Sequence, residues 1–315
     1  MIMKYKVFVD GSAGTTGLRI FDRLAKRDDI ELITIDESKR KDLGERVKAV
    51  NSSDISFLCL PDDAAREVAA AADKSVKILD TSTAHRTLDT WVYGLPELSK
   101  EQREKIQNAT RVAVPGCHAT GFIMIAHPLV KLGICANDYP FTVHSITGYS
   151  GGGKKMIAEY EDNELPLGYE SPRQYGLAQH HKHIPEMTKI SGLAVAPIFN
   201  PIVSNFYSGM VVTVPLHKRL LAKNITPEGV YEAFAKFYEG NKMITIHPYC
   251  ESPCGGFIDS VEKSGADSIE IFVYGSNEQI MLASRYDNLG KGSSGAALQC
   301  MNLMLGADEA TGLVI

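Results

Sequence analysis

KVFVDGSAGTTGLRIFDRL, residues 6–24, is the stretch of the chain that decides the fold. Its apolar start at 6–10 predicts a short strand, the glycine-rich segment 11–17 a turn, and the run 18–24, which is apolar at helical spacing, an amphipathic helix. At such a turn, glycines let the backbone approach a pyrophosphate, and the helix N-terminus supplies free N–H groups and the positive end of its dipole. The stretch therefore predicts the start of a dinucleotide-binding domain.

The glycines of this turn are spaced G-x-x-G-x-x-G, whereas the common dinucleotide fingerprint is G-x-G-x-x-G. A tight strand-to-helix turn without any ligand has the same pattern, so the motif alone leaves both interpretations open. The residues of the turn that we predict to bind a cofactor are Gly11, Ser12, Ala13, Gly14, Thr15, Thr16 and Gly17.

A short polar segment after the expected second strand bears on the choice of cofactor. Asp36 suits a ribose 2′-hydroxyl, whereas Ser38, Lys39 and Arg40 are the residue types that bind a 2′-phosphate. We therefore predict NADP, with Ser38 and Arg40 among its contacts. The alternative is a solvated charge run in a loop.

Strands and helices alternate through the first third of the chain. Residues 31–35, 54–60 and 76–80 are predicted to be strands, and 64–72 a helix between two of them. This alternation predicts a Rossmann-like, doubly wound parallel sheet.

The pattern changes from about Phe141, where longer strands predominate. We expect strands at 142–147, 193–197, 207–215 and 268–274 and a helix at 227–238. The chain therefore predicts a second, α+β domain with a mixed, largely antiparallel sheet.

The last segment, 293–305, is rich in small and apolar residues at helical spacing and ends near Gly306. We expect this helix to dock on the first domain, which would then comprise 1–117 and 293–315 around a second domain of 118–292. A length of 315 residues agrees with two domains of about 100–200 residues each.

Composition narrows the choice of partners. With 33 Lys and Arg against 38 Asp and Glu, the formal charge of −5 gives no net basic field that would recruit nucleic acid or anionic lipid. The N-terminus lacks a signal-peptide pattern, and the longest apolar segment, 119–132, is shorter than the ~20 residues that span a bilayer. We therefore expect a cytoplasmic protein with a small-molecule substrate and neither a nucleic acid nor a membrane as partner.

One cysteine has a distinctive context, although six cysteines in a chain of this length do not imply a disulfide framework. Cys117 follows an apolar strand that ends at Pro115-Gly116, and it opens a helical pattern that continues to Val130. At a helix N-terminus the dipole and unpaired N–H groups stabilise the thiolate and lower its pKa. A buried small hydrophobe is the alternative for a single cysteine. We predict Cys117 to be a nucleophile.

A histidine-rich segment precedes Pro185. If Pro185 lies in the first turn of a helix, His181 and His183 lie just before that helix and are able to face a cleft. Together with Lys182 they offer acid/base groups and an anion contact.

A metal site is not predicted. The remaining group of ligand types, His247-x-x-Cys250-x-x-x-Cys254, fits no standard zinc spacing.

The segment from Gly148 to Lys155 resembles a Walker A loop, but Lys155 stands where the Mg²⁺-binding hydroxyl belongs. It also follows a strand assigned to the second domain. We interpret it as a glycine-rich loop whose amides, with Lys154 and Lys155, could bind a carboxylate or phosphate, and a plain flexible hairpin is the alternative. A nucleotide site, a helix-start cysteine and a histidine together predict redox chemistry through a thioester.

In this order, the motifs resemble the N-acetyl-γ-glutamyl-phosphate reductases, in their shorter class, which are related in fold to aspartate-semialdehyde dehydrogenase. The motifs lie at 11–17, 80–86, 93–98, 115–117, 150–154, 181–186, 287–292 and 299–304. The sequence departs from the longer class at His118, where that class commonly has Tyr, and at Ala84-His85, where it tends to have Ala-Asp-Phe.

The resemblance implies an activity. Cys117 would attack an acyl phosphate, phosphate would leave, and NADPH would reduce the thioester to N-acetylglutamate semialdehyde in arginine biosynthesis. His181 would be the acid/base group, with His183 as the second choice.

The resemblance also implies binding residues and an assembly. Further cofactor contacts are expected from Pro61, Ser82 and Asn288, and substrate contacts from Arg86, Ser150, Gly151 and Lys154. The second domain would serve catalysis and dimerisation, giving a homodimer or homotetramer.

Three alternatives stay open at this point. They are a reductase of a related acyl phosphate of the aspartyl or aminoadipyl type, a nucleotide-sensing relative without turnover, and a Cys-His acyltransferase or hydrolase. The presence of Cys117 and His181 argues against the sensor, and an acyltransferase would be indifferent to nicotinamide.

Overall fold

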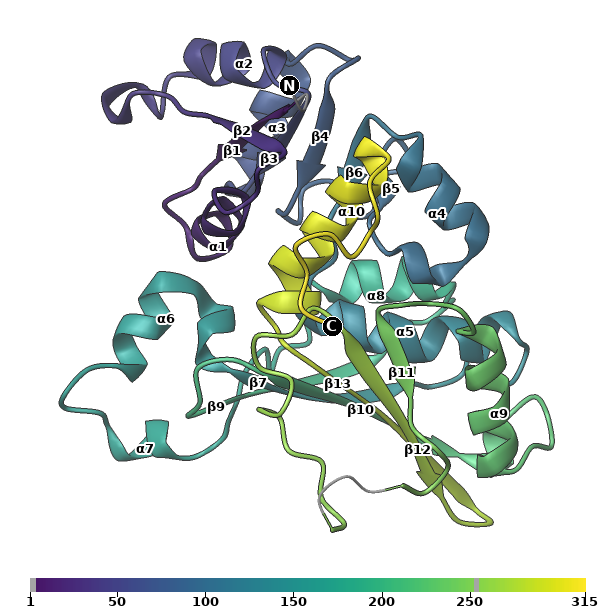
Figure 1. Cartoon of the computed structure of the whole chain (residues 1–315). Helices are drawn as coiled ribbons and strands as arrows, with labels where there is room; N and C mark the ends of the chain where they lie inside the picture. The colour runs from purple at the N-terminus through teal and green to yellow at the C-terminus, as the bar shows by residue number, and fades with distance from the viewer. Residues whose placement is uncertain (1–3, 252–254) are drawn as a thin grey trace. The chain divides into compact units, whose positions relative to one another are not determined.

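The chain divides into two units in the computed structural model, which describes residues 4–251 and 255–315 (Figure 1). The first unit contains Met1–Pro115 and Ser293–Leu313, and the second contains Gly116–Gly292 and Val314–Ile315.

A parallel sheet of six strands forms the centre of the first unit, in the order β2-β1-β3-β4-β6-β5. Its strands are β1 (Tyr5–Asp10), β2 (Ile30–Ile33), β3 (Ile55–Leu58), β4 (Lys77–Asp80), β5 (Val92–Tyr93) and β6 (Arg111–Ala113). The chain adds β2 on one side of β1 and then β3 on the other, so the strand order reverses at β1. The predicted Rossmann-like sheet is confirmed.

Helices cover both faces of this sheet because successive strand residues point to opposite sides. Val7 and Val9 pack with α1, α4 and α10, whereas Phe8 packs with α2 and α3. The helices are α1 (Thr15–Leu24), α2 (Leu43–Asn51), α3 (Asp62–Ala71), α4 (Lys100–Gln107) and α10 (Gly295–Leu305), with 3₁₀ turns at Glu37–Lys39 and Pro96–Leu98.

The C-terminal helix α10, yellow in Figure 1, belongs to the first unit and packs against α4 and β4. It follows a π-helical turn at Gly290–Ser294 and ends at Gly306, whose φ of 74° closes the helix in the left-handed region. This is the end that the sequence predicts.

The first helix begins earlier than predicted. Gly14 is its N-cap and accepts the N–H of Leu18 at 2.8 Å, so Thr15, Thr16 and Gly17 form the first helical turn and not part of the loop.

A mixed sheet of seven strands forms the second unit, in the order β11-β12-β13-β10-β7-β9-β8. The β11–β12 and β7–β9 pairs are parallel, and the other pairs are antiparallel, as predicted. The strands are β7 (Thr142–Gly148), β8 (Arg173–Gln174), β9 (Ile198–Ser204), β10 (Met210–His217), β11 (Ile244–Ile246), β12 (Ile269–Gly275) and β13 (Gln279–Tyr286).

Helices α5 and α9 pack on this sheet, and α8 packs on α5. The helices are α5 (Cys117–Lys131), α6 (Gly153–Tyr160), α7 (Leu167–Glu170), α8 (Ile184–Ser191) and α9 (Pro227–Phe237), with 3₁₀ turns at Tyr149–Gly152 and Lys218–Leu220. Pro128 lies inside α5 and cannot donate to the carbonyl of Met124, which instead accepts the Tyr238 hydroxyl at 2.6 Å.

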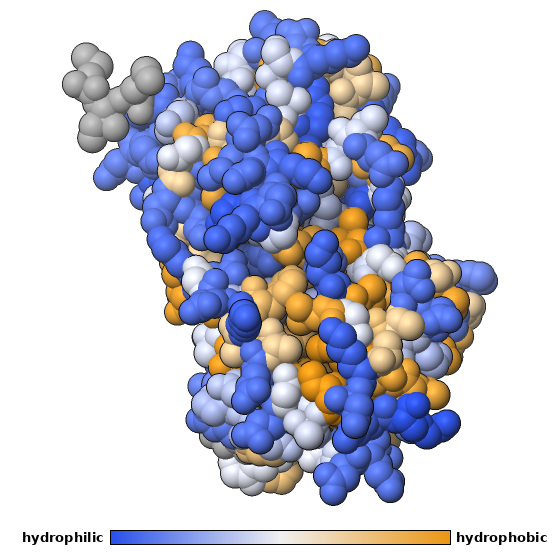
Figure 2. Space-filling model, turned by 90° about the vertical axis from the view of Figure 1, so that its right-hand side faces the viewer, coloured by the Kyte–Doolittle hydropathy of each residue, from blue (hydrophilic) through white to orange (hydrophobic). Residues whose placement is uncertain are grey.

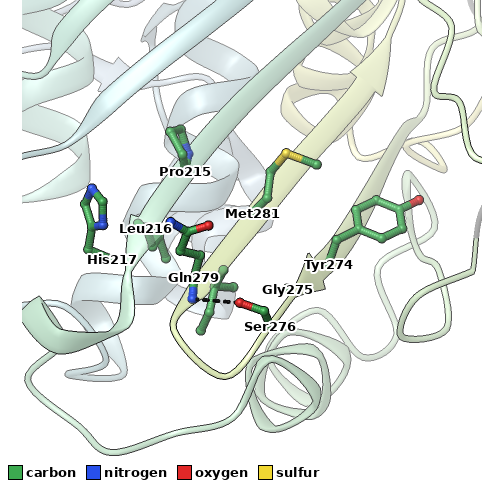
Figure 3. Close-up of a pocket in the computed structure, with 9 residues that line it drawn as sticks. Pro215, Leu216, His217, Tyr274, Gly275, Ser276, Gln279 and Met281 are labelled. Carbon is green, nitrogen blue, oxygen red and sulfur yellow. Dashed lines mark hydrogen bonds between the residues drawn. The ribbon is translucent and has the colours of Figure 1, made fainter.

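The other side of the sheet is partly open at one end. Along β10, Val212, Val214 and Leu216 are buried while Pro215 and His217 are exposed. A cavity of about 450 Å³ lies at this end. Figure 3 shows Pro215 of β10, Tyr274 of β12 and Met281 of β13 around it. The space-filling view of one face of the molecule shows apolar residues gathered in its lower half among polar ones (Figure 2).

The predicted strand at 193–197 is wrong. Gly192 ends α8 with φ 74°, and the Leu193 N–H is taken by the Thr188 carbonyl, so the strand begins only at Ile198. Strand β9 contains Pro201, which has no N–H to donate. The Pro201 carbonyl accepts the Tyr175 N–H on the β8 side, and the ring nitrogen points to the same side. Because β8 has only two residues, the missing N–H costs little pairing there. The sequence also missed β13, the central partner of β10 and β12.

Among the described residues, no helix is both long and apolar enough to cross a membrane.

Candidate functional site

The carboxyl ends of β1, β2 and β3 border a cavity of about 650 Å³ in the first unit. In open parallel sheets, ligands bind at the point where the strand order reverses, which is β1 in this sheet. The volume lies in the ordinary range for a small-molecule site.

The glycine turn is shaped for close approach. Gly11 has φ +83°, and a Cβ there would lie 2.2 Å from the Cys59 carbonyl oxygen. A Cβ on Gly17 would lie 2.3 Å from the Gly11 carbonyl oxygen, so α1 packs directly on the turn. Gly14 caps α1 without a side chain, which leaves the first-turn N–H groups available to an anion.

The predicted cofactor contacts separate into two groups. Gly11, Ser12, Ala13, Gly14, Arg40 and Pro61 line the cavity. Thr15, Thr16, Gly17, Ser38 and Ser82 belong to the same unit but do not line it. Ser38 is turned back on Asp36, to whose Oδ1 its N–H donates at 2.9 Å, and Ser82 donates to Asp80 Oδ2 at 2.7 Å.

Two cations of the cavity were missed by sequence reasoning. Lys41 and Arg46 line it together with Arg40 and two carboxylates, Asp10 and Glu37. Lys41 continues the charge run at 36–40, so the signal was present; Arg46 lies on α2, and only the fold brings it to the cavity. Glycines at 11 and 14, an open helix N-terminus and three cations against two carboxylates fit the phosphates of a dinucleotide.

Cys117 is the first residue of α5, as the sequence predicts, and is half-buried. Its carbonyl accepts the Tyr286 hydroxyl at 2.6 Å, and the same hydroxyl accepts the Gly121 N–H at 3.0 Å. Gly292 leaves room beside it, since a Cβ there would lie 3.0 Å from Cys117 Cβ. The N–H of Gly116 donates to Glu186 Oε2 at 3.1 Å. These bonds fix the backbone at the positive end of α5, where a thiolate would be stabilised.

The two predicted histidines lie at the start of α8, with Pro185 in its first turn. Their ring centroids are 4.7 Å apart. The His183 N–H donates to His181 Nδ1 at 3.2 Å, so Nδ1 accepts and a neutral His181 carries its proton on Nε2. Burial, and after it the positive charge of Lys182, lowers the pKa of His181 to about 4, so the ring is neutral at neutral pH.

A third histidine joins this group. The His118 ring lies 5.7 Å from that of His181 and 5.5 Å from that of His183. Its Nδ1 lies 2.6 Å from Ser145 Oγ and its Nε2 2.7 Å from the Tyr175 hydroxyl. Burial lowers the pKa of His118 to about 3 and, with the nearby Cys117, raises the pKa of Tyr175. The sequence marked His118 only as a departure from the longer class, and Tyr175 carried no signal.

The predicted substrate residues do not form one cluster. Ser150 is buried, and its Oγ accepts from Asn288 Nδ2 at 3.0 Å, while Asn288 Oδ1 accepts the Gly209 N–H at 2.9 Å. Gly151 and Lys154 are exposed, at the 3₁₀ turn and the start of α6. Asn288, predicted as a cofactor contact, therefore braces the Ser150 turn within the second unit.

Arg86 lies in the first unit and is buried. Its Nε donates to the Val114 carbonyl and its Nη2 to the Thr81 carbonyl, each at 2.9 Å. These bonds tie the loop after β4 to the segment after β6.

No group of three or more His, Cys, Asp or Glu side chains within residues 4–251 and 255–315 could hold a metal ion. His247 instead lies 3.1 Å from Glu270, and Cys254 of the weighed zinc group lies outside the described residues.

The model of the semialdehyde dehydrogenase NAD binding domain matches residues 6–109, and that of the semialdehyde dehydrogenase dimerisation domain matches residues 117–288. Aspartate semialdehyde dehydrogenase II from Vibrio cholerae superposes with a TM-score of 0.72 at 16% identity, covering 96% of this chain and 99% of that one. Aspartate semialdehyde dehydrogenase from Francisella tularensis superposes with a TM-score of 0.70 at 14% identity, covering 96% of this chain and 100% of that one. The chain is therefore an oxidoreductase of the semialdehyde dehydrogenase class with a nicotinamide-binding domain.

Full-length relatives narrow the class to one family. An N-acetyl-gamma-glutamyl-phosphate reductase 2 from Nostoc sp. is 45% identical and covers 98% of this chain and 99% of its own. The reductase from Sinorhizobium medicae is 45% identical, and the match covers 97% of this chain and 100% of that one. Reductase 2 from Pseudomonas putida is 43% identical, and the match covers 97% of this chain and 98% of that one. The chain belongs to the N-acetyl-γ-glutamyl-phosphate reductase family, and the predicted family is confirmed.

Proposed function

We propose that this protein reduces N-acetyl-γ-glutamyl phosphate to N-acetyl-L-glutamate 5-semialdehyde with NADPH and releases phosphate, in arginine biosynthesis. The observation that carries the proposal is Cys117 at the first turn of α5 in a chain of this family, next to His118, whose ring lies 5.7 Å from that of the neutral His181. A helix-start thiolate is the nucleophile that acyl transfer to sulfur requires.

The first half of the reaction transfers the acyl group. Cys117 Sγ attacks the acyl carbon, the bond from that carbon to the phosphate oxygen breaks, and phosphate leaves with the electron pair. A thioester then stands on Cys117. The first-turn N–H groups of α5 lie where they can stabilise both the thiolate and the oxyanion of this step.

The second half reduces the thioester. When bound, NADPH would supply the hydride for the thioester carbonyl carbon, and the carbonyl oxygen would then become an oxyanion. His181 stabilises this oxyanion by donating its Nε2–H, because its Nδ1 is occupied by the His183 N–H. When the carbon–sulfur bond breaks, the C=O bond re-forms, the thiolate returns to Cys117 and the aldehyde leaves. His183 is the second choice for this role.

The cofactor part of the proposal assigns NADP to the cavity of the first unit. Gly11, Ser12, Ala13 and Gly14 would hold the pyrophosphate with the N-terminus of α1, and Arg40 the ribose end. The excess of cations at the cavity favours the phosphorylated cofactor over NAD. Substrate contacts are proposed from Ser150, Gly151 and Lys154.

The test runs the reaction backwards with purified protein, phosphate, NADP⁺ and N-acetylglutamate semialdehyde, following the absorbance of reduced nicotinamide. We expect turnover that requires phosphate and falls at least about tenfold with NAD⁺, since a tenfold preference costs only about 1.4 kcal/mol. Aspartate semialdehyde is the matched control substrate. Turnover with aspartate semialdehyde alone, or none with any aldehyde, would overturn the proposal.

We also propose a homodimer or homotetramer that forms through the open face of the seven-stranded sheet. The matching domain model is named for dimerisation, and Met281 and Ile198 on the sheet are 40% and 61% exposed. Light scattering of the wild type and Met281→Glu tests this, because a charge in an apolar interface should dissociate the assembly. A monomeric wild type would refute it.

A further inference from the structure

Helix α2 brings Arg46 to the wall of the nucleotide cavity. Its Nε donates to the Arg40 carbonyl at 2.9 Å and lies 3.3 Å from Asp10 Oδ1. The Arg46 side chain is only 13% exposed and that of Asp10 4%. Neither Nη group of Arg46 has a hydrogen-bond partner within the described part of the chain, so a bound ligand can use both.

Asp10 is the carboxylate that lies next to the Arg46 guanidinium. It is the last residue of β1, and its backbone is fixed because its carbonyl accepts the Cys59 N–H at 2.8 Å. Its Oδ2 is buried without a hydrogen-bond partner among the described residues. A carboxyl in such a place orients the nearest cation strongly, since neither group can turn to water.

The other cations of the cavity are held less firmly. Arg40 is 53% exposed and paired with Glu37, itself 86% exposed, at 3.1 Å. An exposed ion pair of this kind adds little to stability, so it does little to hold the Arg40 side chain in one position. Arg46 has a fixed guanidinium plane, so it loses less conformational freedom when it binds an anion.

Arg46 is bonded to the segment after β2 through the Arg40 carbonyl, and it also lies beside Asp10, which precedes the glycine turn. The glycine turn and the N-terminus of α1 serve the pyrophosphate, whereas the ribose 2′ position of a bound dinucleotide lies near the end of the second strand. The cavity wall on that side is formed by Ile33, Thr34, Ile35, Glu37, Arg40, Lys41 and Arg46.

We propose that Arg46 is the residue that discriminates for the 2′-phosphate of the cofactor, through its two Nη groups, and that Asp10 is its positioning residue. This inference rests on the proposed function, in which the cofactor is NADP.

The experiment measures binding of NADPH and NADH to the purified chain by nucleotide fluorescence, without substrate. We expect Arg46→Ala to raise the Kd for NADPH about 10- to 100-fold and that for NADH less than about twofold, since one charge-assisted bidentate contact is at stake. Arg46→Lys keeps the charge without the fork and should give an intermediate loss. The control is Arg66→Ala, an exposed arginine of α3 paired with Asp63 and remote from the cavity lining.

Asp10→Asn tests the positioning role. We expect a loss of NADPH affinity relative to NADH affinity of about three- to tenfold, because the variant keeps the shape of the side chain and weakens the orientation of Arg46. Asp10 lines the cavity, so the loss of its charge acts on the pyrophosphate of both nucleotides alike. A general loss of structure would lower the affinity for both nucleotides alike.

The outcomes separate this inference from the proposed function. If the wild type prefers NADPH and both Arg46 variants keep that preference, the inference is wrong and the proposed cofactor stands. If Arg46→Lys weakens both nucleotides equally, Arg46 shapes the cavity and does not discriminate. If the wild type binds both nucleotides equally well, the NADP assignment falls and this inference falls with it.

Discussion

The nucleotide cavity and the Cys117 site use charge in opposite ways. The cavity gathers cations at the end of a parallel sheet, and Arg40 and Lys41 among them are exposed to water. Near Cys117, burial lowers the pKa of His118 and His181, so that both rings are neutral at neutral pH. The first arrangement selects an anion by attraction, and the second removes water from a reacting carbon. The cation-rich cavity lies in the first unit, and Cys117 with its histidines in the second.

The largest effect should come from Cys117→Ser. A serine hydroxyl at a helix start is far less acidic than a thiol, so we expect turnover to fall at least about 10³-fold while the Kd for NADPH stays within about twofold. Steady-state rates and fluorescence titration measure the two quantities. Cys135→Ser is the control, since Cys135 is a buried cysteine away from a helix start. An active Cys117→Ser would remove the thioester from the mechanism.

A smaller loss is expected from His181→Asn. Removing a positioned proton donor should lower kcat about 10²- to 10³-fold with little change in the KM for NADPH. His183→Asn is the comparison variant, and a larger loss there than at His181 would move the role to His183.

The pH dependence of the wild type sharpens the same test. Because the pKa of His181 is about 4 in the folded protein, the ring should stay neutral, and its contribution to kcat constant, from neutral pH down to about pH 5. An ordinary histidine would titrate near pH 6.5. An acid limb centred there and absent in His181→Asn would contradict the burial argument.

Local signals carried most of the prediction. The glycine turn, the helix start at Cys117, Pro185 in a first turn and the left-handed end at Gly306 are all where the sequence indicates. Each depends on residues within a few positions of one another, so spacing alone was enough.

The missed residues depend on contacts between distant segments. Arg46 can be recognised as a site residue only once the fold places Asp10 beside it. His118 can be recognised only once Ser145 and Tyr175 are seen to contact its two ring nitrogens. The strand at Ile198–Ser204 contains a proline that argues against a strand until the short β8 partner is known. The spacing of apolar residues along the sequence does not reveal which distant segments pair.

The smallest effect is a change of stability with pH in Asp10→Asn. Burial raises the pKa of Asp10 to about 6, although Arg46 and the Gly11 amide oppose this rise. Burial thus shifts the pKa values of Asp10 and His181 in opposite directions, and in each case it favours the neutral form. Between about pH 4 and pH 6 the folded state binds a proton that the unfolded state has released, and the wild type therefore loses stability as the pH rises through this window. Asparagine does not titrate.

The free energy of unfolding of Asp10→Asn, relative to the wild type, should therefore shift in favour of the variant by roughly 2 kcal/mol from pH 4 to pH 7, since each pKa unit is worth about 1.4 kcal/mol. Urea unfolding at the two pH values measures it. Asp63→Asn on exposed α3 should show a flat difference. A shift of opposite sign would mean that the attraction of Arg46 outweighs the burial of Asp10, and that this pair, unlike the histidines around Cys117, is held by charge.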